Sequence, residues 1–156
     1  MTVSPDRLAA AALVVGSAVV GGLATDPDSR WFTRLSKPSF YPPPQTFGIV
    51  WTALYTGIGW AGGEVLTTAG PQQRHDFARA FAANLALNTA WTPIFFRAHR
   101  PWLATAESAA LTVSTVDLVR RADRVSRPAA AALVPYAAWT AFATVLSGAI
   151  ARRNRR

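Results

Sequence analysis

The 156-residue sequence contains no cysteine, which excludes a disulfide framework and any metal site built from thiolates. Lysine is almost absent as well, because Lys37 is the only one among 16 cationic residues and the rest are arginine. The net charge of +8 does not indicate nucleic-acid binding, since the arginines cluster at the ends of apolar segments without a nucleic-acid-binding motif. Such flanks are typical of headgroup contact, so we expect membrane lipid as a partner and no nucleic acid.

Charge is also absent from residues 8–24, the first of five long apolar segments. A bilayer crossing takes about 20 such residues. The sequence therefore predicts an all-α membrane protein, a single domain over residues 1–156 folded as a bundle of five transmembrane helices. The expected helices cover residues 7–24, 46–68, 77–96, 102–119 and 129–150, with a lid loop over residues 25–45 and a basic tail over residues 151–156.

Three acidic residues interrupt these segments: Glu64, Glu107 and Asp117. A charged side chain at the bilayer centre costs about 3 kcal/mol on insertion scales and usually faces protein or a polar cavity. We expect structural or interfacial roles for all three. The sequence offers no nucleophile–base pair, no phosphate-binding loop and no cluster of metal ligands.

Residues 31–55 concentrate proline and aromatic residues. Prolines at 42–44 fix φ and lack amide donors, so we predict a stiff loop up to about Pro44. The helix that follows carries Phe47, Trp51 and Tyr55 on one stripe. Two interpretations fit: a lid and wall for a flat apolar ligand, or an aromatic belt at the membrane interface.

The third segment has two faces. One is a ladder of small residues every four positions, a pattern that lets helices approach closely in lipid: Ala78, Ala82, Ala86 and Ala90. The other is polar and aromatic: Asn84, Asn88, Trp91 and Phe95. We predict that the ladder contacts a second copy of the chain and that the opposite face lines a pocket. The alternative is that the alanines pack within one bundle and the amides bond neighbouring helices.

Three motifs resemble the TspO/MBR family of tryptophan-rich sensory proteins and translocator proteins. They are WFxxLxKPxFxPPxxxFxxVWxxLY over residues 31–55, ALNxxWxxxFF over 86–96 and PYxxWxxFAxxL over 135–146. The resemblance implies a five-helix bundle, commonly dimeric, whose pocket opens beside the loop between the first two helices. It implies porphyrins such as protoporphyrin IX or haem, and drug-like apolar molecules, as ligands, with no cofactor required.

The resemblance also assigns residues to this pocket. The lid contributes Trp31, Phe32, Pro42 and Pro43, and the helices contribute Trp51, Tyr55, Asn84, Asn88, Trp91, Trp139, Phe142 and Ala143. Phe32 stands where the family usually has tyrosine, which removes a hydroxyl from the lid. Trp139, Phe142 and Ala143 also fit ordinary helix packing.

The resemblance leaves the activity open among three functions. The first is a sensor or translocator that binds tetrapyrroles. The second is an enzyme that degrades porphyrin with light and oxygen, in which Trp51 and Trp139 take the catalytic role. The third is a transporter of small amphipathic molecules. Alanine- and arginine-rich usage is typical of a GC-rich bacterium, so we expect a multi-pass protein of the bacterial cell envelope.

Overall fold

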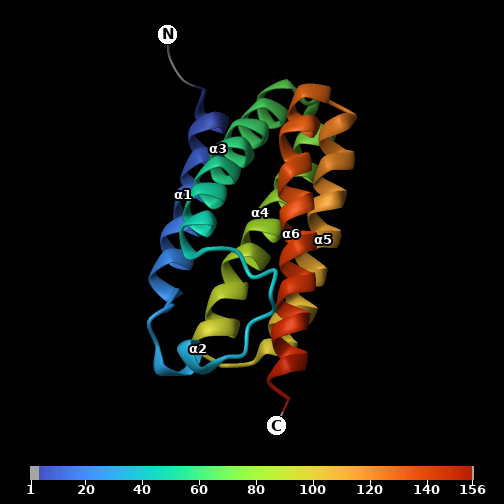
Figure 1. The fold of residues 1–156 in the computed structure, drawn as a ribbon. Helices are drawn as coiled ribbons and strands as arrows, with labels where there is room; N and C mark the ends of the chain where they lie inside the picture. The colour runs from blue at the N-terminus through green and yellow to red at the C-terminus, as the bar shows by residue number, and fades with distance from the viewer. Residues whose placement is uncertain (1–3, 156) are drawn as a thin grey trace.

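The computed structural model describes residues 4–155, and within this range the chain forms five long helices and one short helix, with no strand. The predicted all-α class is confirmed. The helices are α1 (Pro5–Ala24), α2 (Arg30–Arg34), α3 (Pro44–Thr68), α4 (Pro71–Phe96), α5 (Pro101–Asp123) and α6 (Arg127–Arg153) (Figure 1). Residues 1–3 and Arg156 of the predicted domain and tail lie outside the described residues.

The long helices start earlier than predicted because proline begins them. Proline occupies the first turn of α1, α3, α4, α5 and α6. The missing amide costs nothing there, since the first four N–H groups of a helix have no partner within it. The largest correction is to α4, which starts at Pro71 rather than at residue 77.

Two predicted irregular segments were partly wrong. Residues 25–45 contain helix α2, whose N-cap Ser29 accepts a hydrogen bond from the Phe32 amide at 3.3 Å, and the last two belong to α3. We call residues 25–43, including α2, the lid. The basic tail was also placed too early, because residues 151–153 continue α6.

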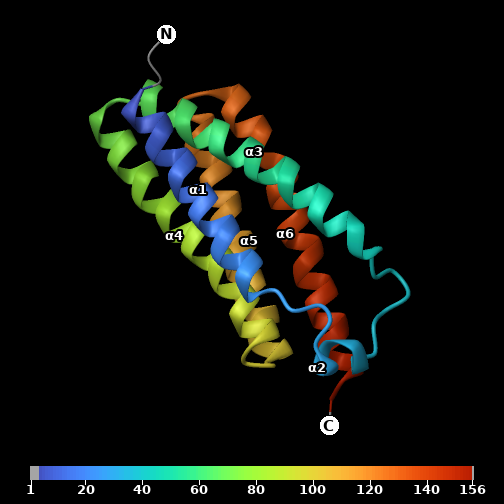
Figure 2. The same ribbon diagram turned by 90° about the vertical axis from the view of Figure 1, so that its left-hand side faces the viewer.

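The five long helices form a closed ring in the order α1, α3, α6, α5, α4, with α4 returning to α1. Figure 2 shows α1 lying across α3 and α4, as their contacts require. The described chain starts at one end of the bundle and finishes at the other, where the lid also lies (Figure 1). The lid therefore covers the end of the ring at which α4 stops and α6 finishes.

The apolar core also contains polar side chains, and many large apolar side chains lie on the surface. Buried side chains include Asn84, Asn88, Ser108 and Thr115, whereas Leu23, Ile49 and Val113 are more than two-thirds exposed at 75, 71 and 72%. Apolar patches on this scale mark contact with a membrane or a partner. By length and hydropathy α1 and α6 are long and apolar enough to cross a membrane, among the described residues.

Candidate ligand-binding site

A hydrogen-bonded network fills the centre of the bundle. Asn84 and Asn88 of α4 are buried, as is Tyr136 of α6. The Tyr136 hydroxyl donates to Asn84 Oδ1 at 3.0 Å and accepts from Asn88 Nδ2 at 3.1 Å. The other amide atoms bond the side chains of Ser114, Thr115, Tyr55 and Ser17. The network joins all five long helices in one layer.

These bonds bear on the two interpretations of the asparagines. Both amides form hydrogen bonds to neighbouring helices, as the alternative to a pocket-lining role expected. Asn84 Nδ2 donates twice, to Ser114 Oγ at 3.1 Å and to Thr115 Oγ1 at 3.0 Å, so its donors are already used. Ligand contact by Asn84 or Asn88 stays a prediction. For Asn84 it requires an exchange of hydrogen bonds, whereas Asn88 Nδ2 donates one hydrogen bond and keeps a second donor.

Aromatic rings join α2 to the end of α4. Phe95 makes edge contacts with Trp31 and Phe32, at centroid distances of 5.3 and 6.2 Å. Trp91 stacks on Phe95 at 5.0 Å with the ring planes 10° apart. The Trp31 indole also stacks on His99 at 4.3 Å. Helix α2 thus brings the first two rings of the lid directly onto α4.

The ring contacts continue through the lid to α3 and α6. Tyr41 contacts Phe32 at 6.4 Å and Phe47 at 5.5 Å. Phe47 meets Trp139 edge-on at 5.9 Å, and Trp139 lies 5.3 Å from Phe142. We call this unbroken series of seven rings the aromatic path: Trp91, Phe95, Phe32, Tyr41, Phe47, Trp139 and Phe142.

Trp51 and Tyr55 connect the stripe on α3 to the polar network. Their rings stack at 5.2 Å, and Trp51 meets the Tyr136 ring edge-on at 6.3 Å. The Tyr55 hydroxyl donates to Asn88 Oδ1 at 2.9 Å. Both side chains pack against the buried core, so this part of the predicted stripe faces into the bundle.

Two contacts hold the lid in place. Ser36 and Asn154 exchange a reciprocal pair of hydrogen bonds, both 3.0 Å long, which ties the lid to the end of α6. Lys37 Nζ donates to the Phe32 carbonyl at 3.0 Å and lies 4.3 Å from the Phe32 ring centroid. Burial raises the pKa of the Tyr41 phenol, so this lid hydroxyl stays protonated at neutral pH.

Comparison with known proteins identifies this arrangement. The sequence model of the TspO/MBR family matches residues 9–153. The chain belongs to the TspO/MBR family.

Named relatives from bacteria and animals support this assignment. A tryptophan-rich protein TspO from Chlorobaculum tepidum is 34% identical over 149 residues, covering 92% of this chain and 94% of its own length. The translocator protein of Homo sapiens is 34% identical over 127 residues, covering 80 and 75%. A tryptophan-rich sensory protein from Cereibacter sphaeroides is 32% identical over 139 residues, covering 89 and 85%.

Membership of the TspO/MBR family, whose proteins are integral membrane proteins, explains the large apolar side chains on the surface of the bundle. The relatives carry the names of sensory and translocator proteins, and the chain is a membrane protein of the same family. The apolar surface faces lipid, and the polar side chains bond one another inside.

The remaining predicted residues lie at the edges of this arrangement. In the lid, Pro42 is half-buried and Pro43 is exposed. Ala143 is half-buried on α6, next to Phe142. Of the alanine ladder on α4, Ala82 and Ala86 are exposed, and Ala78 and Ala90 are half-buried. The two faces predicted for this helix are therefore distinct, with alanine outward and asparagine inward.

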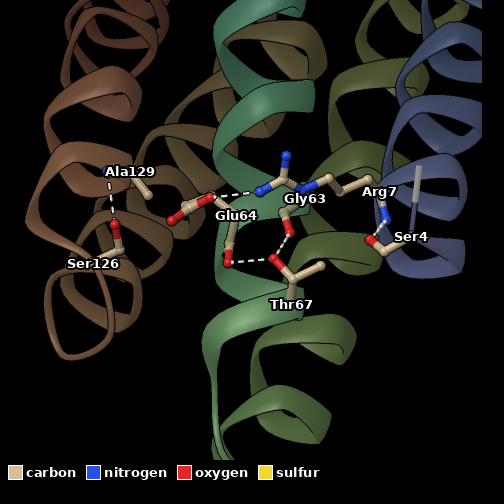
Figure 3. A network of polar contacts seen from close by, with 7 residues as sticks. All are labelled: Ser4, Arg7, Gly63, Glu64, Thr67, Ser126 and Ala129. Carbon is tan, nitrogen blue, oxygen red and sulfur yellow. Dashed lines mark hydrogen bonds and ion pairs between the residues drawn. The ribbon is translucent and has the colours of Figure 1, made fainter. Parts of the chain in front are cut away.

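The three acidic residues differ in their partners. Arg7 of α1 pairs with Glu64 of α3 at 3.1 Å, next to the Thr67 hydroxyl, which donates to the Gly63 carbonyl at 2.8 Å (Figure 3). Asp117 pairs with Arg121 one turn later at 2.6 Å. These contacts fit the structural roles expected for Glu64 and Asp117. Neither carboxylate oxygen of Glu107 has a hydrogen-bond partner in the described chain, although both are shut off from the surface.

An open groove of about 900 Å³ lies between α4 and α5, far along these helices from the lid. Its lining includes Arg79, Ala83, Val113 and Arg120, and it contains none of the predicted ligand-binding residues. The groove also contains Asp76, Asp117 and Arg121, so it is a charged surface groove separate from the predicted ligand-binding residues.

Sequence reasoning missed two central residues. Tyr136 lies inside the motif over residues 135–146 and was not singled out, although its hydroxyl holds both asparagines. Tyr41 links the two halves of the aromatic path, and its position among prolines marked it only as loop. Tyrosine next to proline in a motif was the available signal for both.

Proposed function

We propose that this protein is a membrane receptor that binds flat tetrapyrroles, such as protoporphyrin IX or haem, and senses them or hands them on. The aromatic path carries the proposal. Its rings come from the lid, α3, α4 and α6, so a disc inserted among them contacts several faces and edges at once. Each aromatic pair contributes about 0.5–1.5 kcal/mol beyond area burial.

The charge at the lid end suits the anionic propionates of a porphyrin. Arg34 and Lys37 lie in the lid, and Arg97 and Arg100 lie in the connection after α4. Charge-assisted hydrogen bonds to carboxylates are roughly twice as strong as neutral ones. Lys37 has three donors and gives one to the Phe32 carbonyl, so it retains capacity for a ligand.

We also propose five membrane crossings in a bacterial cell envelope. Helices α3, α4 and α5 have 25, 26 and 23 residues, or about 35–39 Å at 1.5 Å per residue, enough for a hydrocarbon layer of about 30 Å. The outward residues of α3 and α5 include Ile49, Trp60, Leu103 and Val113. The low mean hydropathy of α4 and α5 comes partly from polar side chains that bond inside the bundle.

A homodimer through α4 belongs to the same proposal. Ala82 and Ala86 expose a low surface that lets a second backbone approach closely. The chain has no native thiol, so Ala82→Cys introduces a single one. We expect a disulfide-linked dimer in membranes for Ala82→Cys and none for Val145→Cys, whose residue is equally outward on α6. Equal yields from the two variants would contradict an α4 interface.

Titration with protoporphyrin IX tests the binding proposal. The Soret band of the porphyrin is followed, so that the readout does not depend on which tryptophan is removed. Trp51→Ala removes a ring that packs against Tyr55 and Tyr136. Trp60→Ala is the matched control, because Trp60 lies nine residues later on α3 with 48% of its surface exposed.

We expect Trp51→Ala to weaken binding by about tenfold, which corresponds to about 1.4 kcal/mol and to the loss of one or two ring contacts. Trp60→Ala should bind like the unmodified protein. Equal affinity in all three proteins would place the ligand elsewhere, and no saturable binding by the unmodified protein would refute the proposal itself.

Two further assays distinguish the other two functions, porphyrin degradation and transport. Under light and oxygen, bleaching that stops in Trp51→Phe or Trp139→Phe would favour porphyrin degradation, whereas equal bleaching would remove the protein from that chemistry. Flux through vesicles above the leakage of empty liposomes would favour transport.

A further inference from the structure

Two buried polar groups in the described chain have no hydrogen-bond partner. They are the indole N–H of Trp91 on α4 and the carboxyl group of Glu107 on α5. An unsatisfied buried polar group costs about 1–3 kcal/mol. Such a group in a native protein indicates strain, function or a bound molecule. One is a donor and the other carries acceptor oxygens, so their chemistry is complementary.

The register of α4 and α5 brings the two groups to the same level. These helices run antiparallel, and Asn84 on α4 bonds Ser114 on α5. Trp91 lies seven residues after Asn84 on α4, and Glu107 lies seven residues before Ser114 on α5. Both positions therefore lie about two turns from the same bond, towards the lid end.

Glu107 lies on the inward side of α5. It follows buried Ala104 by three residues and precedes buried Leu111 by four, which are same-face spacings. Ala104 belongs to the same buried cluster as Phe32, Phe95 and the partly buried Trp91. Glu107 therefore lies one turn along α5 from a residue that packs in the same cluster as Trp91 and Phe95.

We propose that Trp91 and Glu107 form a polar anchor for one group of the bound ligand, a group that carries a hydrogen-bond donor beside an acceptor. The donor satisfies Glu107 and the acceptor satisfies the Trp91 N–H. On a porphyrin this group is the undissociated carboxyl of one propionic acid, which shares its proton with Glu107. This inference rests on the proposed function, because it names a subsite of the same pocket.

Other ligand groups match less well. An ammonium group offers donors only and leaves the Trp91 N–H unsatisfied, and an ether or ester oxygen offers an acceptor only. A single water molecule also carries both functions, and the experiment must separate it from the ligand.

The test compares protoporphyrin IX with its dimethyl ester, which keeps the macrocycle and loses both acid hydrogens. The variants are Glu107→Met, which removes the carboxyl group, Glu107→Gln, which keeps a donor and an acceptor, and Trp91→Phe, which keeps a ring and loses the N–H. Asp117→Met serves as the matched control, because Asp117 is a second carboxyl on α5 that pairs with Arg121 and is not among the proposed ligand-binding residues. Thermal unfolding of each protein is measured alongside.

We expect the unmodified protein to prefer the acid over the ester by about tenfold, the size of one hydrogen bond. Glu107→Met and Trp91→Phe should abolish this preference with ester affinity changed less than threefold, while Glu107→Gln and Asp117→Met should keep it. Glu107→Met should also unfold at a higher temperature, because it removes an unpaired buried group.

The inference is overturned if Glu107→Met keeps the preference for the acid over the ester. That is the result expected if a water molecule alone occupies the anchor. A preference lost in Asp117→Met as well, or lost equally in Glu107→Gln and Glu107→Met, also overturns it. Failure of the unmodified protein to bind either porphyrin would instead refute the proposed function, so the two failures are distinguishable.

Discussion

Replacing Gly62 by alanine tests a close approach between α3 and α4. A Cβ atom at Gly62 would lie 2.6 Å from Phe81 Cζ and 3.0 Å from Cε2. Carbon atoms in contact are about 3.5–4.0 Å apart, so the ring would have to move by roughly 1 Å. Phe81 is 1% exposed and stacked on Phe77 at 5.7 Å, which leaves it little freedom to move.

Two opposing terms set the size of the effect. Overpacking of a filled core costs about 1–3 kcal/mol. Alanine in place of glycine in a helix recovers about 0.5–1 kcal/mol. We therefore expect Gly62→Ala to lower the free energy of unfolding by about 0–2.5 kcal/mol.

Gly59→Ala isolates the steric term. Gly59 lies three residues earlier on α3, and a Cβ atom there meets nothing within 4 Å. Gly59→Ala gains the same stability from replacing glycine by alanine in a helix, but without a clash. The unfolding free energies of the two variants should therefore differ by the overpacking cost alone, about 1–3 kcal/mol. At about 2–4 °C per kcal/mol for a chain of this size, Gly62→Ala should melt about 2–12 °C below Gly59→Ala.

The assay is thermal unfolding in detergent, followed by circular dichroism. Phe81→Leu in the Gly62→Ala background should relieve the clash, so the double variant should be more stable than the sum of the single effects predicts. The reasoning is refuted if Gly62→Ala melts at or above Gly59→Ala.

Two further predictions concern the polar network and the lid. Tyr136→Phe leaves Asn84 Oδ1 and Asn88 Nδ2 without the hydroxyl they share and should cost about 1–3 kcal/mol of unfolding free energy in the same assay. Tyr55→Phe should cost less, because Asn88 Oδ1 still accepts a hydrogen bond from a serine. A larger cost for Tyr55→Phe would contradict this ranking of the two variants. Asn154→Ala removes both hydrogen bonds to the lid, about 1–2 kcal/mol in total at an exposed site. Hydrogen exchange at the Ser36 amide should then accelerate about 5–30-fold, and an unchanged rate would show that other contacts hold the lid.

Residue pattern alone determined the helices and the family. Long apolar runs predicted five long helices, and proline and aromatic spacing over residues 31–55 marked the lid and the stripe on α3. The spacing of Ala82 and Ala86 against Asn84 and Asn88 separated the outer face of α4 from its inner face. Such patterns are readable because helical period and amide-free proline act locally along the chain.

Only the tertiary structure decided the partners. The sequence placed Asn84 and Asn88 on one face, but their bonds to Tyr136 depend on the register between helices about 50 residues apart. The same register brings Arg7 to Glu64 and leaves Glu107 without a partner. A helical pattern fixes which way a side chain points, whereas the group it meets depends on how separate helices slide and rotate against one another.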